Sequence, residues 1–543
     1  MLSYRKLAMR VLGRPLHTGR IDSPRPASQR AAAFILTAAM LTTLAAPAFA
    51  KTWYIENGNI TVKAGKIEGT NKVSQGETTD EKDTDTIITN REDKASSNTV
   101  TIEAKDKDDK VEVTLKDVNI DTSSRNKAAV SVTGEGDTNI KLDGDNALKS
   151  DIYRSGIYGS GSGSLTISGG ENDSLTAQGG SGANGISSSG SLTISGGTVT
   201  ANGDDGGRGI SSSGSVTISG GSTVTANGGS GTISGGDGIW SGGGVTISGG
   251  STVTANGGNG GSLVGGDGIR SGGGLTVSDG TVTAKGGNGD SKDGYGGDGI
   301  RSGGVVTISG NTVNAAGGYG GKVGGYGICS FDRVAISGGT VEAAGGNGST
   351  GGGSGIYSSV IDLSGSLELT AKAGSPTGKA LLQNGRELDL DTIKDKLGPG
   401  AKVTATDANG DSKQVSIPRP VEPEEPVIPE ESSSSSDGGS ATPSAPVSPL
   451  PGLTVTDKDG QRISYTSTQS GNTLTVCVGR LTASFRISLA ALRQLRAEGI
   501  ETIAFQTVLC STTLSVDELL AMGGENAEAV LTHRFTDSSL TVG

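Results

Sequence analysis

Three aspartates recur in the same short motif at nearly constant spacing. Asp237, Asp267 and Asp298 each follow two glycines and precede Gly-Ile, and they are 30 and 31 residues apart. If these segments stack, the carboxylates lie one above another and repel unless positive charge lies between them. Calcium, which binds carboxylate and backbone oxygens, would balance this charge. Arg270 and Arg301 would balance it without a metal, and aspartate after Gly-Gly is also a common turn residue.

A second set of residues suits sugar binding. Along the repeats, the position after each Gly-Ile holds Tyr158, Ser187, Ser211, Trp240, Arg270, Arg301, Cys329 and Tyr357. An indole ring stacks on the apolar face of a sugar, and guanidinium groups bind hydroxyls or carboxylates. We therefore predict a carbohydrate-binding site formed by Trp240, Arg270, Arg301, Tyr295, Tyr326 and Tyr357. The alternative is that these residues are only a solvated surface.

Catalysis is the second class of function to consider. Glycoside hydrolysis needs paired carboxylates, and lyase chemistry needs a base beside a bound uronate. After residue 50 the chain has one histidine, His533, and the Asp-Gly-Ile-Arg motif repeats, whereas an active site should depart from a repeat. We expect no enzyme activity, with a polysaccharide lyase or glycoside hydrolase as the alternative.

The segments that carry these residues are repeats. The Gly-Ile step occurs at Ile157, Ile186, Ile210, Ile239, Ile269, Ile300, Ile328 and Ile356, at spacings of 24 to 31 residues. A period of this size is typical of a solenoid. Within a repeat, apolar and polar residues alternate, as in Leu192-Thr-Ile194 and Val199-Thr-Ala201, which indicates strands. We predict an all-β fold, a right-handed parallel β-helix with three short strands per coil and these residues facing inward.

Variation in repeat length is confined to one corner. Six residues separate Ile186 from Leu192, and the equivalent pairs in the next five repeats have the same spacing. The gap before each Gly-Ile varies, from nine residues between Ala201 and Ile210 to 13 to 16 later. Insertions on one face of a solenoid often mark its binding side.

The rest of the chain divides by composition. Residues 1–50 have a basic start and an apolar run to Ala50, which predicts a signal peptide and export, with no membrane insertion after cleavage. Residues 51–150 are predicted as degenerate first coils and a cap, with a polar surface excursion from Lys66 to Lys94. Residues 151–417 hold the repeats and a C-terminal cap, 418–451 a proline- and serine-rich linker, and 452–543 a small α+β module that contacts a cell-surface partner.

The charge limits the partners. Removing residues 1–50 leaves 45 − 7 = 38 basic and 57 − 1 = 56 acidic residues, a net charge of −18. Such a chain is unsuited to nucleic acid or to an anionic membrane.

Several early segments resemble a known family. Val111–Ile120, Ala128–Val132, Ile140–Leu148 and Gly156–Ser160 resemble secreted clostridial carbohydrate-binding β-helix proteins, over roughly Asn98 to Ala371. The resemblance implies a pectate-lyase-like fold that binds cellulose or acidic plant polysaccharide, with calcium, at the cell surface. It assigns no individual residue. Together these features predict a secreted or cell-surface protein that binds polysaccharide without catalysis, with a structural adhesin as a further alternative.

Overall fold

The computed structural model describes residues 50–418 except 93, and residues 452–542 except 457–461, 464, 471, 479–481, 508–510, 523–526 and 534–537. All but the last residue of the predicted signal peptide, and all but the first of the predicted linker, lie outside the described residues. The chain divides into two compact units, which meet in sequence at Pro423 and Glu424.

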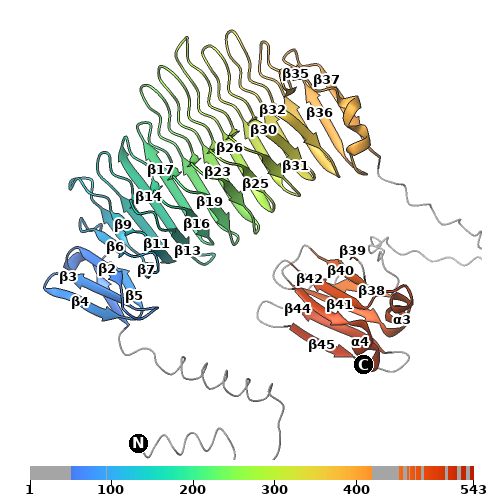
Figure 1. The fold of residues 1–543 in the computed structure, drawn as a ribbon, viewed down its shortest axis with the longest axis horizontal. Helices are drawn as coiled ribbons and strands as arrows, with labels where there is room; N and C mark the ends of the chain where they lie inside the picture. The colour runs from blue at the N-terminus through green and yellow to red at the C-terminus, as the bar shows by residue number, and fades with distance from the viewer. Residues whose placement is uncertain are drawn as a thin grey trace, which may run out of the picture. The chain divides into compact units, whose positions relative to one another are not determined.

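The first unit is a parallel β-helix of about 13 turns, as predicted (Figure 1). One coil contains β15 (Ile186–Ser188), β16 (Leu192–Ser195) and β17 (Thr198–Asp204). Each strand pairs in parallel with its equivalent in the next coil, in the register that aligns the repeats. The predicted three strands per coil are therefore confirmed.

The other coils follow the same order. The first strands are β12 (Ile157–Gly159), β18 (Ile210–Ser212), β21 (Ile239–Ser241), β24 (Ile269–Ser271), β27 (Ile300–Ser302), β30 (Ile328–Ile336) and β32 (Ile356–Leu363), the last two continuing through the first corner. The second strands are β13 (Leu165–Ser168), β19 (Val216–Ser219), β22 (Val245–Ile247), β25 (Leu275–Val277) and β28 (Val306–Ile308). The third strands are β14 (Ser174–Ser181), β20 (Thr223–Asn227), β23 (Ser251–Asn256), β26 (Gly280–Lys285), β29 (Thr312–Ala316), β31 (Gly339–Ala344) and β33 (Leu367–Lys372).

Aliphatic ladders fill the interior. The residues predicted to face inward, Ile186, Leu192, Ile194, Val199 and Ala201, are all fully buried. Each has an aliphatic equivalent in the next coil, because the coils stack in register. This stacking gives a narrow core that needs few aromatic side chains.

A buried serine ladder forms the first corner. The hydroxyl of Ser241 donates to the carbonyl of Gly214 in the preceding coil (2.9 Å), and Ser302 donates to Gly273 (2.8 Å). Because a serine must reach the same carbonyl in each coil, the corner keeps its length. This explains the constant six-residue spacing across it.

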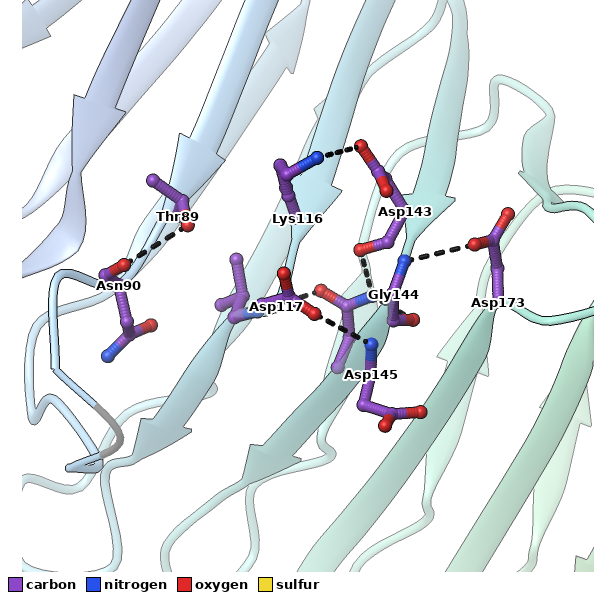
Figure 2. Close-up of polar contacts among 10 residues, drawn as sticks. Thr89, Asn90, Lys116, Asp117, Asp143, Gly144, Asp145 and Asp173 are labelled. Atoms are coloured by element: carbon purple, nitrogen blue, oxygen red, sulfur yellow. Dashed lines mark hydrogen bonds and ion pairs between the residues drawn. The ribbon is translucent and has the colours of Figure 1, made fainter.

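At the second corner of the early coils, between the second and third strands, carboxylates bind backbone amides of the neighbouring coil (Figure 2). Asp117 accepts the N–H of Asp145 at 3.1 Å, and Asp173 accepts that of Gly144 at 2.9 Å. Lys116 and Asp143 form an ion pair at 2.7 Å beside them. These aspartates therefore satisfy amides that the strands leave unpaired where the chain turns.

The glycine-rich insertions form an ordered structure that we call the glycine blade, residues 228–238, 257–268, 286–299, 317–327 and 345–355. Each insertion has an outgoing and a return segment (Figure 1). The N–H of Gly257 donates to Lys285 of the next coil, whereas the N–H of Gly258 donates to Gly236, in the return segment of the preceding coil. The N–H of Gly266, on the return segment, donates to Gly258. Successive amides thus point to different neighbouring segments, as in a polyproline II-type backbone with three residues per turn.

Side chains satisfy the amides at one position of the outgoing segments and at one position of the return segments. The N–H of Asn259 donates to the Ser230 hydroxyl (3.1 Å), and the side-chain oxygen of Asn259 accepts the N–H of Asn288 (2.9 Å). Gly257 and Gly258, the two residues before Asn259, lie directly against the backbone of neighbouring segments, so a side chain has no room at either position. The repeated Gly-Gly-x pattern follows from this period of three.

The N-terminal coils are less regular. They contain β1 (Lys51–Tyr54), η1 (Ile55–Asn57), β2 (Ile60–Ala64), β3 (Asn71–Gln75), β4 (Thr78–Asp83), β5 (Thr86–Thr89), β6 (Val100–Ala104), β7 (Lys110–Lys116), β8 (Asn119–Asp121), β9 (Val130–Gly134), β10 (Asp137–Asp143) and β11 (Asp145–Lys149). The prediction that Lys66–Lys94 is only a surface excursion is wrong. Strands β3 and β4 form an antiparallel extension of β2, and β5 is a solenoid strand between β1 and β7. Val73 and Ile88 are fully buried, and the polar composition of the segment as a whole hid them from sequence reasoning.

The C-terminal end of the solenoid is closed, as predicted. It contains β34 (Leu381–Gln383), β35 (Arg386–Glu387), the 3-10 helix η2 (Leu390–Lys396), β36 (Lys402–Thr406) and β37 (Ser412–Ser416). Leu390 and Ile393 of η2 are buried in the solenoid core, and β37 pairs antiparallel with β36. The last apolar rung is thereby covered.

The second unit has two four-stranded sheets and two helices. Its elements are β38 (Leu453–Thr456), β39 (Thr466–Ser470), β40 (Thr473–Cys477), β41 (Ala483–Ser488), α3 (Leu489–Ala497), β42 (Thr502–Gln506), β43 (Ser511–Ser515), α4 (Val516–Met522), β44 (Glu528–His533) and β45 (Ser538–Val542). The predicted helix begins after Ser488, whose hydroxyl accepts the Ala491 N–H, and Gly499 follows it in a left-handed conformation. No helix of the described ranges has both the length and the hydropathy that crossing a bilayer requires.

We predict that Gly258→Ala strongly destabilises the solenoid. A Cβ atom at Gly258 would lie 2.1 Å from the carbonyl oxygen of Gly229, which is backbone and cannot turn aside. We expect a loss of about 3 kcal/mol in the free energy of unfolding, measured by denaturant titration. Gly351→Ala is the matched control in the same blade, because its nearest contact would be at 3.5 Å. Equal effects of the two substitutions would contradict the packing described.

Thr138→Val should stabilise the protein. Thr138 pairs with Val111 and Leu165 in a core ladder, and its hydroxyl has no hydrogen-bond partner among the described residues. Replacing a buried, unpaired hydroxyl with a methyl group should add about 1 kcal/mol to the free energy of unfolding. Thr217→Val, on the outer face of β19, should change it by less than about 0.5 kcal/mol.

Candidate functional site

The outward row predicted from the repeat is present. Trp240, Arg270, Arg301 and Tyr357 belong to consecutive or nearly consecutive coils, and the strand register aligns them. Cys329 lies between Arg301 and Tyr357 in this row. It was expected on the surface but is buried, and this burial raises the pKa of its thiol to about 12.

The aromatic residues of the predicted sugar site are largely engaged with neighbours. The Arg208 guanidinium lies over the Trp240 ring at 4.5 Å, and the rings of Tyr326 and Tyr357 stack on each other at 5.1 Å. Tyr295 lies apart from them at the tip of the blade. The structure therefore separates Tyr295 from the row and places the Arg208 guanidinium against the Trp240 ring.

The aspartates form a buried column along the return segments of the blade. Asp237, Asp267 and Asp298 are each less than 7% exposed. The Asp267 N–H donates to Asp237 (2.9 Å), the Asp298 N–H donates to Asp267 (2.7 Å), and the Tyr326 N–H donates to Asp298 (2.7 Å). Each carboxylate thus satisfies the third amide of the next return segment, as Asn259 does on the outgoing side.

Arginines pair with the second oxygen of each carboxylate. Arg208 Nε lies 3.1 Å from Asp237, and Arg301 lies 3.2 Å from Asp298. Arg270 is farther from Asp267, at 3.9 Å. The arrangement present is therefore the arginine alternative to calcium. The six to eight oxygen ligands of calcium are not assembled here, and no described part of the chain groups three or more His, Cys, Asp or Glu side chains for a metal ion.

Burial changes the protonation of this column. Desolvation, with the charges of Asp298 and Asp237 adding to it, raises the pKa of Asp267 from 3.8 to about 8. Desolvation also raises the pKa of Asp298, to about 6, against the opposing effects of the Tyr326 N–H and Arg301. At neutral pH the Asp267 carboxyl group is therefore mostly uncharged. Since it is the carboxyl group paired with Arg270, the positive charge of Arg270 is not neutralised by it.

A groove of about 560 Å³ lies between the glycine blade and the outward row. We call it the blade groove. Its lining includes Arg208, Arg270 and Arg301, with Asp237 and Asp267 beside them. The glycines at 206–207, 235–236 and 265–266, which directly precede Arg208, Asp237 and Asp267 in the chain, also line the groove, together with Val264. The groove thus combines guanidinium groups with glycine backbone.

Arg208 was missed by sequence reasoning. It occupies in its own repeat the position that Asp237 has in the next, since Gly-Gly-Arg-Gly-Ile replaces Gly-Gly-Asp-Gly-Ile. The change from aspartate to arginine in an otherwise repeated motif could have pointed to Arg208. Phe331, under the Arg301 guanidinium at 5.3 Å, had no such signal because it lies outside the motif.

No protein-family model, no curated protein and no solved structure matches this chain. The resemblance to clostridial carbohydrate-binding proteins therefore stays a prediction.

We predict that Asp267→Asn changes how stability depends on pH. The folded-state pKa of Asp267 is raised, so the wild-type protein loses stability as pH rises from about 4 to about 8, while this carboxyl group ionises only in the unfolded chain. Asparagine can still accept the Asp298 N–H but does not titrate. The variant should be more stable than the wild type at pH 8 by more than about 1 kcal/mol, with the gain disappearing towards pH 4. Thermal unfolding across this range would measure it, with Asp290→Asn on the exposed blade tip as the control. A constant difference at all pH values would contradict the assignment.

Proposed function

We propose that this protein binds an acidic polysaccharide in the blade groove without catalysing its cleavage, as an exported or cell-surface protein. The observation that carries the proposal is the set of three arginines along one open groove of an otherwise acidic chain. A guanidinium group matches a carboxylate in shape and in hydrogen-bond donors.

The protonation of the aspartate column supports an anionic ligand. Arg208 and Arg301 are paired with Asp237 and Asp298, but Arg270 faces a carboxyl group whose pKa is about 8. Arg270 is also about half exposed. It therefore retains a positive charge that a uronate carboxylate can neutralise.

The shape of the groove supports a chain-like ligand. Its lining residues come from successive coils, which stack about 4.8 Å apart, so the groove follows the solenoid axis. A polysaccharide with a carboxylate on each sugar presents charge repeatedly along such a path. The glycines of the lining let the chain approach the backbone closely.

The test is binding of polygalacturonate by full-length protein with Arg270→Gln. We expect binding to weaken at least about tenfold, since one charge-assisted contact is lost. Arg333→Gln is a closely matched control. The Arg333 side chain is 51% exposed and lies 4.0 Å from Asp362, against 49% and 3.9 Å for Arg270 and Asp267. Isothermal titration calorimetry at pH 7 would measure both.

The proposal fails if the wild-type protein does not bind the polymer, or if Arg270→Gln binds as tightly as the wild type. The appearance of new reducing ends or unsaturated uronate products during incubation would show an enzyme instead.

A further inference from the structure

We infer that the tips of the glycine blade form an apolar lip of the blade groove, which contacts the C–H face of the sugar rings. This inference rests on the proposed function and adds three aliphatic residues to Tyr295, which the sequence analysis had already assigned to a carbohydrate-binding site. The lip residues are Ile233, Leu263, Val264 and Tyr295, and all four side chains are at least 40% exposed.

The four residues are contiguous across successive tips. The N–H of Leu263 donates to the carbonyl of Ile233 (2.9 Å), and the N–H of Tyr295 donates to that of Leu263 (2.7 Å). Val264 and Tyr295 also pair as a parallel bridge. The lip is therefore held by backbone hydrogen bonds, although it lies at the far end of long insertions.

The position of Val264 links the lip to the groove. Val264 lines the groove together with Ser234, the residue after Ile233, and with Arg270. A ligand in the groove thus meets the guanidinium groups of Arg270 and Arg301 on the solenoid strands and the aliphatic side chain of Val264 at the blade tip. A sugar ring has hydroxyl or carboxylate groups at its edge and C–H groups on its face, so it complements both sides.

Exposed apolar residues in a row need a physical reason in such a polar chain. Scattered surface apolar residues are ordinary, but a contiguous row marks a contact surface. The groove beside the row, with its repeated cationic groups, favours the bound polysaccharide as the occupant. A second copy of the chain is the other occupant that the test must distinguish.

The experiment compares Val264→Thr with Val360→Thr in the full-length chain. Threonine keeps the shape of valine and replaces a methyl group with a hydroxyl. Val360, on β32, is also 40% exposed but does not line the groove. With an oligogalacturonide as the probe, we expect Val264→Thr to bind about fourfold more weakly, from the loss of one buried methyl contact. Its binding heat-capacity change should also be less negative, since less apolar surface is buried.

The outcomes separate this inference from the proposed function. If the wild type binds but Val264→Thr has an unchanged affinity and binding heat-capacity change, the lip does not contact the ligand. The proposal that the groove binds the polysaccharide is then unaffected. If Arg270→Gln and the wild type both fail to bind, both ideas fall. If sedimentation shows a wild-type dimer that Val264→Thr dissociates, the lip is a contact between copies of this chain and the inference is overturned.

Discussion

Direct contact between the backbones of neighbouring glycine segments is the constraint on which the rest of the molecule depends. A Cβ atom at Gly266 would lie 1.9 Å from the carbonyl oxygen of Gly236, and similar distances recur along the blade. The segments can approach this closely only because two of every three residues lack a side chain. The 94 glycines of the sequence are therefore, in large part, a packing requirement. The same composition without this arrangement would be typical of a disordered chain.

Each coil with a blade insertion contains two kinds of backbone, which place their side chains with different periods. The solenoid strands alternate with a period of two, which places Ile269 inward and Arg270 outward. The blade segments have a period of three, which leaves Asn259 and Asp267 as the positions that carry side chains. The blade groove lies where these two kinds of backbone meet. Arg270 and Arg301 come from the solenoid strands, whereas Asp237 and Asp267 come from the blade segments.

The aspartate column shows how a repeat can tolerate stacked acidic residues. Each carboxylate accepts an amide hydrogen from the next coil, so replacing it with an apolar residue would leave that amide unsatisfied. The cost of burying the charge is relieved in two ways, by arginine at Asp237 and Asp298 and by protonation at Asp267. Figure 2 shows the same role in the early coils, where the carboxylates of Asp117 and Asp173 accept amide hydrogens of a neighbouring coil but lie nearer to solvent. Aspartate is thus first a structural residue here, and the charge of the groove follows from how each one is balanced.

The sequence by itself determined the coil, its register and its inward ladders, because alternation and a constant corner length are local patterns. It also placed Trp240, Arg270 and Arg301 in one row, since strands in register bring equivalent positions together. Only the tertiary structure decided what the variable corner is. Its hydrogen bonds join residues of neighbouring coils, and a Gly-Gly-x pattern does not reveal which segments will be adjacent. The same reason applies to Arg208 over Trp240 and to the burial of Cys329, because both depend on which side chains the next coil happens to supply.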